Sequence, residues 1–334
     1  MQDFLQNFVS RWDGHSYLFL ATNGYVTKGD EAAFIVFPPF YPLLIRLLNF
    51  FLQNPALAAF LISTLAFIAG ILVFYKLLRL DYPKSKSIWI TVVLLIFPTS
   101  YFFLTAYPES LFFLLIVSVL YLSRKKNFLA ACFVAAFASL TRPFGILIWP
   151  AIFIEWFTQK EKDWLDLILI ASFSFCSSVI YLSLNYSLFG NPFAFQYFLS
   201  SHWQKSFDFP WKGIITSWQR GITTPNSNPE YKYLVGYGEA LASTIPYLFI
   251  LLNVLFKKIR MRFSYLVYFI LSAILMTSTT FILSTPRYLL SIPPFFITLG
   301  SLTNNKIIRV IWTIISIIIL IYITRLFTEG HWTF

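Results

Sequence analysis

Long apolar runs alternate with short polar connections along this chain, and this pattern predicts an all-α polytopic membrane protein. A helix that crosses a bilayer needs roughly 20 mostly apolar residues, and fewer where the span is short. By this measure we expect about ten transmembrane helices. They are predicted near residues 56–78, 88–105, 109–123, 127–141, 144–157, 164–187, 237–256, 262–283, 287–301 and 306–325. The sequence has no internal repeat, so residues 1–334 are expected to form a single membrane domain.

Two stretches are expected to form external loops, residues 1–55 and residues 188–236. Residues 34–51 are apolar enough to span, but they contain Pro38, Pro39, Pro42 and Arg46. We therefore expect an interfacial helix that lies along the membrane surface. The second loop is rich in tryptophan and tyrosine, which favour the membrane interface.

Composition supports a membrane protein. The chain is 58% hydrophobic and only 12% charged, whereas soluble domains carry about 25% charged residues. The net charge of +11 lies in short connections between apolar runs rather than on a basic stripe, so nucleic acid is not an expected partner. Membrane lipids are expected partners.

The basic residues also predict an orientation. Fifteen of the 25 lysines and arginines lie in the connections at 76–87, 124–126, 158–163, 257–262 and 302–309. The positive-inside rule assigns these connections to the cytoplasm. The other connections then face the exterior of a bacterial plasma membrane or the lumen of the endoplasmic reticulum. All the candidate functional motifs lie in this second set.

Two carboxylates on the external side are candidates for chemistry. Asp13 stands in the motif Arg-Trp-Asp-Gly, beside an aromatic residue at a lipid-adjacent surface. Desolvation there disfavours the charged form, so Asp13 could act as a general base; it could equally cap a helix or pair with Arg11. Glu109 follows Pro108 at the start of an apolar helix, where it could cap that helix, hold a substrate hydroxyl or pair with a cation.

Arg142 and Arg287 lie at external helix ends beside prolines. A guanidinium group binds phosphate in a bidentate fork, so both are candidate phosphate ligands. Pairing with Glu109 or Asp13, or contact with lipid headgroups, would also explain them. His202 in the second loop could bind a phosphate or a sugar hydroxyl, or could be an ordinary surface histidine.

Several kinds of chemistry have no signature in this sequence. The three histidines have no metal-ligand spacing, and there is no phosphate-binding glycine-rich loop. We therefore expect neither a metal nor a cofactor. Because no soluble nucleotide-binding domain is apparent, a transferase of this kind would use a sugar donor carried on a lipid phosphate.

In this order, the motifs resemble those of the PIG-V type mannosyltransferases of the GT-C superfamily, whose eukaryotic members add the second mannose of glycosylphosphatidylinositol. The matching pieces are Arg-Trp-Asp-Gly-His-Ser-Tyr-Leu at 11–18, Asn-Gly-Tyr at 23–25, Phe-Pro-Pro-Phe-Tyr-Pro-Leu-Leu-Ile-Arg at 37–46, Thr-Ala-Tyr-Pro-Glu-Ser-Leu-Phe at 105–112, Leu-Thr-Arg-Pro-Phe-Gly at 140–145, Phe-Gly-Asn-Pro at 189–192, Ser-His-Trp at 201–203 and Pro-Arg-Tyr-Leu at 286–289. Together they extend over nearly the whole chain. The resemblance implies a GT-C-like bundle and a polyprenyl-phosphate sugar donor.

The resemblance also implies roles for individual residues. Asp13 would take the proton from an acceptor hydroxyl in a single inverting displacement, and Glu109 would position the acceptor or its loop. Arg287, with Arg142 or His202, would hold the departing phosphate. Trp12, Arg11, Tyr107 and Trp203 are expected to position the substrates. We therefore expect Asp13 and Arg287 to share one cavity.

The family normally has a spanning helix before the Trp-Asp loop, whereas ten residues precede Arg11 here. We therefore expect either an N-terminally incomplete product or a shorter variant. The acceptor would be a lipid or a glycan. Two alternatives stay open: a flippase or carrier for a lipid-linked glycan, and another outward-facing membrane transferase.

Overall fold

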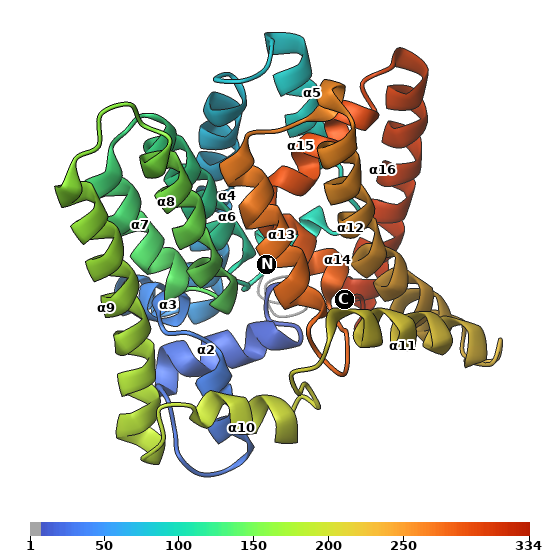
Figure 1. Ribbon diagram of the computed structural model, residues 1–334. Helices are drawn as coiled ribbons and strands as arrows, with labels where there is room; N and C mark the ends of the chain where they lie inside the picture. Colours follow the sequence, from blue (N-terminus) through green and yellow to red (C-terminus); the bar gives the residue numbers. More distant parts are fainter. Residues whose placement is uncertain (1–7) are drawn as a thin grey trace.

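The computed structural model describes residues 8–334, and most of them are helical (Figure 1). Within this part of the chain there is no strand, only an isolated bridge between Phe207 and Thr279. The prediction of an all-α protein is therefore confirmed. The first seven residues of the predicted external loop lie outside the described residues.

Each predicted helix has a counterpart in the structure. The α-helices are α2 (Asp13–Asn23), α3 (Phe40–Leu52), α4 (Pro55–Leu78), α5 (Lys84–Leu95), α6 (Glu109–Arg124), α7 (Phe128–Ser139), α8 (Trp149–Phe157), α9 (Trp164–Phe189), α10 (Ala194–Ser201), α11 (Pro210–Thr223), α12 (Glu239–Leu255), α13 (Phe263–Thr277), α14 (Thr285–Tyr288), α15 (Pro293–Leu302) and α16 (Lys306–Glu329). Short 3₁₀ segments occupy Asp30–Val36, Ser100–Leu104, Pro143–Ile148, Lys257–Ile259 and Leu289–Ser291, and a π-helical segment, Tyr231–Gly238, leads into α12.

Four helical segments of the described chain are long and apolar enough to cross a membrane. They are α4, α9, the continuous segment Tyr231–Leu255, and α16. Most of the other predicted spans correspond to shorter apolar helices, so the number of about ten crossings stays a prediction. The outer faces of the long helices suit lipid: Phe175 on α9 is 70% exposed and Ile318 on α16 is 62% exposed.

Residues 34–51 do not form the one continuous helix that was predicted, and the interfacial placement of this region stays a prediction. A 3₁₀ segment ends at Val36, α3 begins at Phe40, and the two are bent by 112°. Pro38 and Pro39 lie at the break, where their missing N–H groups and fixed φ angles end the first helix. After this bend α3 packs against α2.

Prolines also explain two other differences from the predicted boundaries. Residues 88–105 do not form one helix, because α5 ends at Leu95 shortly before Pro98 and a 3₁₀ segment follows. The helix expected at 287–301 is divided, since α15 begins only at Pro293. Both interruptions lie next to motif residues in the sequence.

The buried core is strongly aromatic. α4 packs along α6, and Phe67 of α4 stacks on Phe103 with ring centroids 4.6 Å apart. The Tyr41 hydroxyl of α3 hydrogen-bonds the Ser63 hydroxyl of α4 at 2.8 Å. Figure 1 shows α2, α10 and α11 at one end of the bundle and α5 at the other. The sequence motifs meet toward the first of these ends.

Candidate active site

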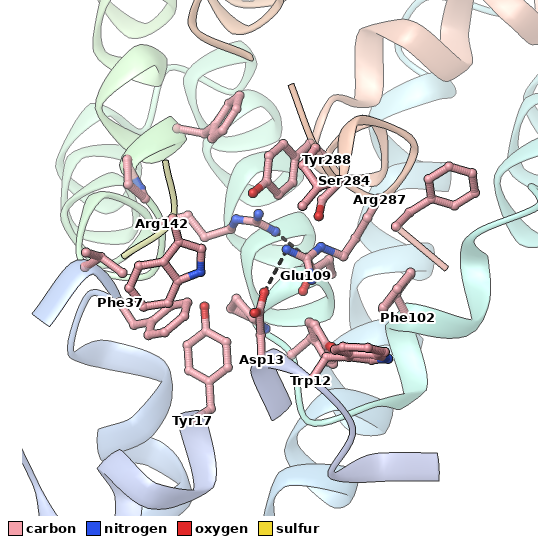
Figure 2. Close-up of a pocket in the computed structure, with 18 of the residues that line it drawn as sticks. Trp12, Asp13, Tyr17, Phe37, Phe102, Glu109, Arg142, Ser284, Arg287 and Tyr288 are labelled. Carbon is pink, nitrogen blue, oxygen red and sulfur yellow. Dashed lines mark hydrogen bonds and ion pairs between the residues drawn. The ribbon is translucent and has the colours of Figure 1, made fainter. Parts of the chain in front are cut away.

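Most of the motif residues line one cavity of about 340 Å³ (Figure 2). Asp13 comes from α2, Glu109 from α6, Arg142 from the connection before α8, and Arg287 from α14. These four positions are far apart in the sequence, and tertiary packing brings their charged groups together. The expectation that Asp13 and Arg287 share a cavity is confirmed.

Local backbone geometry places Asp13 at the cavity. It is the first residue of α2, and Trp12 before it has a φ of 50°, a region that a bulky residue rarely adopts. A Cβ atom on Gly14 would lie 2.8 Å from the Val9 carbonyl oxygen, so this close approach requires glycine. The Asp13 side chain is 29% exposed, and its Oδ2 lies 2.9 Å from Arg287 Nη2.

Glu109 connects the two arginines. Its side chain is 1% exposed, and its Oε1 lies 2.6 Å from Arg142 Nη1 and 3.3 Å from Arg287 Nε. It makes no side-chain capping hydrogen bond at the start of α6. The observed geometry therefore favours cation pairing among the alternatives. Within the described chain, Glu109 Oε2 is buried without a hydrogen-bond partner.

Arg287 is held by the segment that carries it. The buried Glu239 carboxylate accepts hydrogen bonds from Ser284 N at 2.6 Å and Thr285 N at 2.8 Å. The Thr99 hydroxyl donates to the Pro286 carbonyl at 2.9 Å. These contacts hold the start of α14, directly before Arg287.

Aromatic rings surround the cations. The Arg287 guanidinium lies 5.0 Å from the centroid of the Tyr107 ring and 5.3 Å from that of Tyr288, while Arg142 lies 4.9 Å from the Tyr288 ring. Contacts of this kind stabilise a cation that is removed from water.

The cavity carries more positive than negative charge. Lys205 also lines it, with Nζ 3.3 Å from the Leu283 carbonyl oxygen and 3.4 Å from the Tyr288 hydroxyl. The Tyr288 side chain lies among the cationic groups of Lys205, Arg287 and Arg142. The lining residues include three cations and two carboxylates, so the cavity has a net positive charge that favours an anion.

Not every predicted residue reaches this cavity. Trp12, Tyr107 and Trp203 line it, whereas His202 and Arg11 do not. His202 is exposed at the end of α10 and contacts the Trp203 ring, with centroids 4.4 Å apart. The Arg11 guanidinium donates to the Thr328 carbonyl, and its own carbonyl accepts from the Tyr107 hydroxyl at 3.0 Å.

The structure adds residues that the sequence did not single out: Tyr17, Lys205, Ser284 and Tyr288 in the lining, and Glu239 behind it. Lys205 lies two residues after Trp203, and Tyr288 directly follows Arg287. Their closeness to these motif residues could have identified them as candidates. Glu239 had no such signal, because its role depends on a contact across 45 residues. Among residues 8–334, no group of three His, Cys, Asp or Glu side chains could hold a metal ion.

Comparisons with known proteins identify no family. No protein-family model matches the sequence, and no curated protein is significantly similar to it. Among solved structures, the crystal structure of ArnT from Cupriavidus metallidurans bound to undecaprenyl phosphate is similar, with a TM-score of 0.44 and 14% sequence identity. The match covers 94% of this chain and 72% of that one. So distant a likeness assigns neither a family nor a reaction.

Proposed function

We propose that this protein is an integral membrane glycosyltransferase that moves a sugar from a polyprenyl-phosphate donor to a hydroxyl group of a lipid or glycan acceptor. The observation that carries the proposal is the single cavity in which Asp13 faces Arg287 at 2.9 Å. A general base and a phosphate ligand are the two groups that such a transfer requires of the protein. The resemblance to the PIG-V type enzymes suggests mannose as the sugar and the external or lumenal face as the active side.

The reaction would be a single displacement that inverts the anomeric carbon. The acceptor oxygen attacks this carbon from the face opposite the phosphate, and Asp13 takes the hydroxyl proton. The bond between the anomeric carbon and the phosphate oxygen breaks, and polyprenyl phosphate leaves with the electron pair. Arg287, Arg142 and Lys205 would stabilise the negative charge that accumulates on the phosphate.

Donor binding must first open the observed ion pair. Arg287 Nη2 is occupied by Asp13, and a phosphate that approaches Arg287 competes with this carboxylate. The donor phosphodiester carries one negative charge, as the carboxylate does, and its two free oxygens match the guanidinium fork. Its arrival would free Asp13 to accept a proton, while Glu109 keeps both arginines in place.

The decisive experiment is a transfer assay with the purified full chain in lipid nanodiscs. Radiolabelled mannose on a polyprenyl phosphate is the donor, and a membrane lipid extract supplies acceptors. We expect labelled lipid or glycan product, and we expect Asp13→Asn to lower its rate by about 10²–10⁴-fold, the usual contribution of a general base.

Asp30→Asn is the matched control. Asp30 lies at the start of the 3₁₀ segment Asp30–Val36, is exposed and does not line the cavity. It should therefore leave transfer unchanged. Full activity of Asp13→Asn would remove the proposed base. Movement of the intact donor across a bilayer without any sugar transfer would instead identify a carrier.

A further inference from the structure

A second cavity lies toward the opposite end of the bundle from the candidate active site. Its volume is about 430 Å³, and it opens between the first turns of α5 and α16. Figure 1 shows α5 at the upper end, whereas α2 and α10 lie at the lower end. We name this cavity the basic groove; its lining residues are Lys84, Ser85, Ile88, Trp89, Val92 and Arg309. Two of the six are cationic and none is acidic.

Arg309 is fixed at the groove but keeps an unused donor. Its guanidinium lies 5.1 Å from the centroid of the Trp89 ring, and its Nη2 donates to Asn304 Oδ1. The Trp89 indole in turn donates to the Thr303 hydroxyl at 3.0 Å. Arg309 Nε is buried with no hydrogen-bond partner in the described part of the chain. A buried donor without a partner is unfavourable, so the guanidinium favours an added acceptor oxygen.

The start of α5 adds to the positive potential of the groove. Lys84 is its first residue, and no side chain caps its free N–H groups. These groups carry the positive end of the helix dipole and favour an anion. The start of α16 differs, since Asn305 Oδ1 already accepts from Ile307 N at 2.9 Å. The groove therefore offers two cationic side chains and one uncapped helix end.

The position of the groove fits a lipid better than a soluble anion. Arg309 lies in the first turn of the apolar helix α16, which places it where headgroups meet the acyl chains. Ile88 and Val92 stand one and two turns farther along α5, and Ile88 is 45% exposed. The lining thus changes from cationic to apolar with depth, as a phospholipid does from phosphate to acyl chain.

We propose that the basic groove binds an anionic phospholipid, with its phosphate between Lys84 and Arg309 and an acyl chain along Ile88 and Val92. Basic pockets between membrane helices on the cytoplasmic side are suited to such headgroups, and the positive-inside rule assigns this end of the bundle to the cytoplasm. The site is separate from the cavity of Asp13, and the proposal does not depend on the transfer reaction.

Native mass spectrometry of the full chain, released from detergent micelles, tests this proposal. Phosphatidylglycerol and phosphatidylcholine of identical acyl chains are the probes. We expect the wild-type chain to retain phosphatidylglycerol at least about tenfold better, a difference of about 1.4 kcal/mol. The double variant Lys84→Ala/Arg309→Ala should lose this preference. Lys125→Ala should keep it, because Lys125 is an exposed cation that does not line the groove.

A second variant keeps the test decisive if the double variant does not fold. Ile88→Trp fills the apolar part of the groove and leaves both cations in place, so it should weaken retention of phosphatidylglycerol about tenfold or more. Soluble glycerol 3-phosphate at the same concentration should not displace the lipid. Equal retention of both lipids by the wild type, an unchanged preference in both variants, or displacement by glycerol 3-phosphate would each overturn the proposal.

Discussion

At the scale of single residues, the candidate site is a chain of alternating charges. Asp13, Arg287, Glu109 and Arg142 follow one another in contact, and the two central groups are almost completely buried. Buried charges are costly unless they are paired, so each member depends on its neighbours. A substitution here can therefore change both stability and transfer, and the two must be measured separately.

Asp13→Asn is expected to have opposite effects on donor binding and on the rate of transfer. Without the carboxylate, the donor phosphate no longer competes for Arg287 Nη2, so donor affinity should rise about threefold to tenfold while the transfer rate falls. Equilibrium binding of a polyprenyl phosphate, measured beside the transfer rate in the same preparation, checks this. Weaker binding by Asp13→Asn would contradict competition between Asp13 and the phosphate.

Glu109→Gln should affect folding as well as activity. It leaves the buried Arg142 without its carboxylate partner and Arg287 with Asp13 alone. Breaking a buried pair costs about 3–5 kcal/mol. Thermal unfolding in detergent should show a clearly lower Tm. The exposed Glu161→Gln is the matched control and should leave Tm unchanged. An unaltered Tm for Glu109→Gln would mean that the arginines find other partners.

At the scale of elements, the short segment α14 is the part that most needs external support. It has four residues and follows Ser284, whose φ is 70°. Two backbone N–H groups at its start bind the Glu239 carboxylate of α12. The position of Arg287 is therefore set by a helix that contributes nothing to the cavity lining itself.

Glu239→Gln should loosen α14 without changing the lining. A glutamine side chain has one oxygen and can accept only part of what the carboxylate accepts, so we expect transfer to fall about tenfold, or about 1.4 kcal/mol. Because Arg287 acts on the leaving phosphate, the loss should appear mainly in kcat. Glu230→Gln, on the exposed surface, serves as the control. A loss confined to the KM of the acceptor would argue against this positioning role.

At the scale of the whole molecule, the sequence predicted the long helices and the meeting of the motifs better than it predicted the helix boundaries. The apolar runs at 56–78, 164–187 and 306–325 became α4, α9 and α16, because long uniform runs leave no alternative to a helix in lipid. The motif ends of several helices converged as expected. The 3₁₀ breaks were not predictable, because a proline can kink a helix, end it or begin a new one. The contact of Glu239 with α14 was not predictable either, because pairing between distant residues leaves no local sequence pattern.

Orientation is the prediction that belongs to this scale. In a background where Cys132 and Cys176 are replaced by alanine, cysteines introduced as Asp30→Cys and Lys125→Cys lie on the two sides of the bundle that the lysine and arginine count distinguishes. A membrane-impermeant maleimide applied to intact bacterial cells should label the first and spare the second until the membrane is opened. The reverse labelling would invert the whole topology and place the cavity in the cytoplasm.

The length of α6 has a consequence for which donors can be used. Its 16 residues extend about 24 Å at 1.5 Å per residue, less than the roughly 30 Å of hydrocarbon in a typical bilayer. In the orientation predicted from the lysines and arginines, with Arg124 at the cytoplasmic surface, Glu109 at the other end of α6 would lie beneath the opposite surface. A reactant must therefore sink below the level of the surrounding headgroups to arrive there. A donor with a long, flexible isoprenoid tail already resides at this depth in the membrane. A water-soluble donor would have to lose its hydration to reach it.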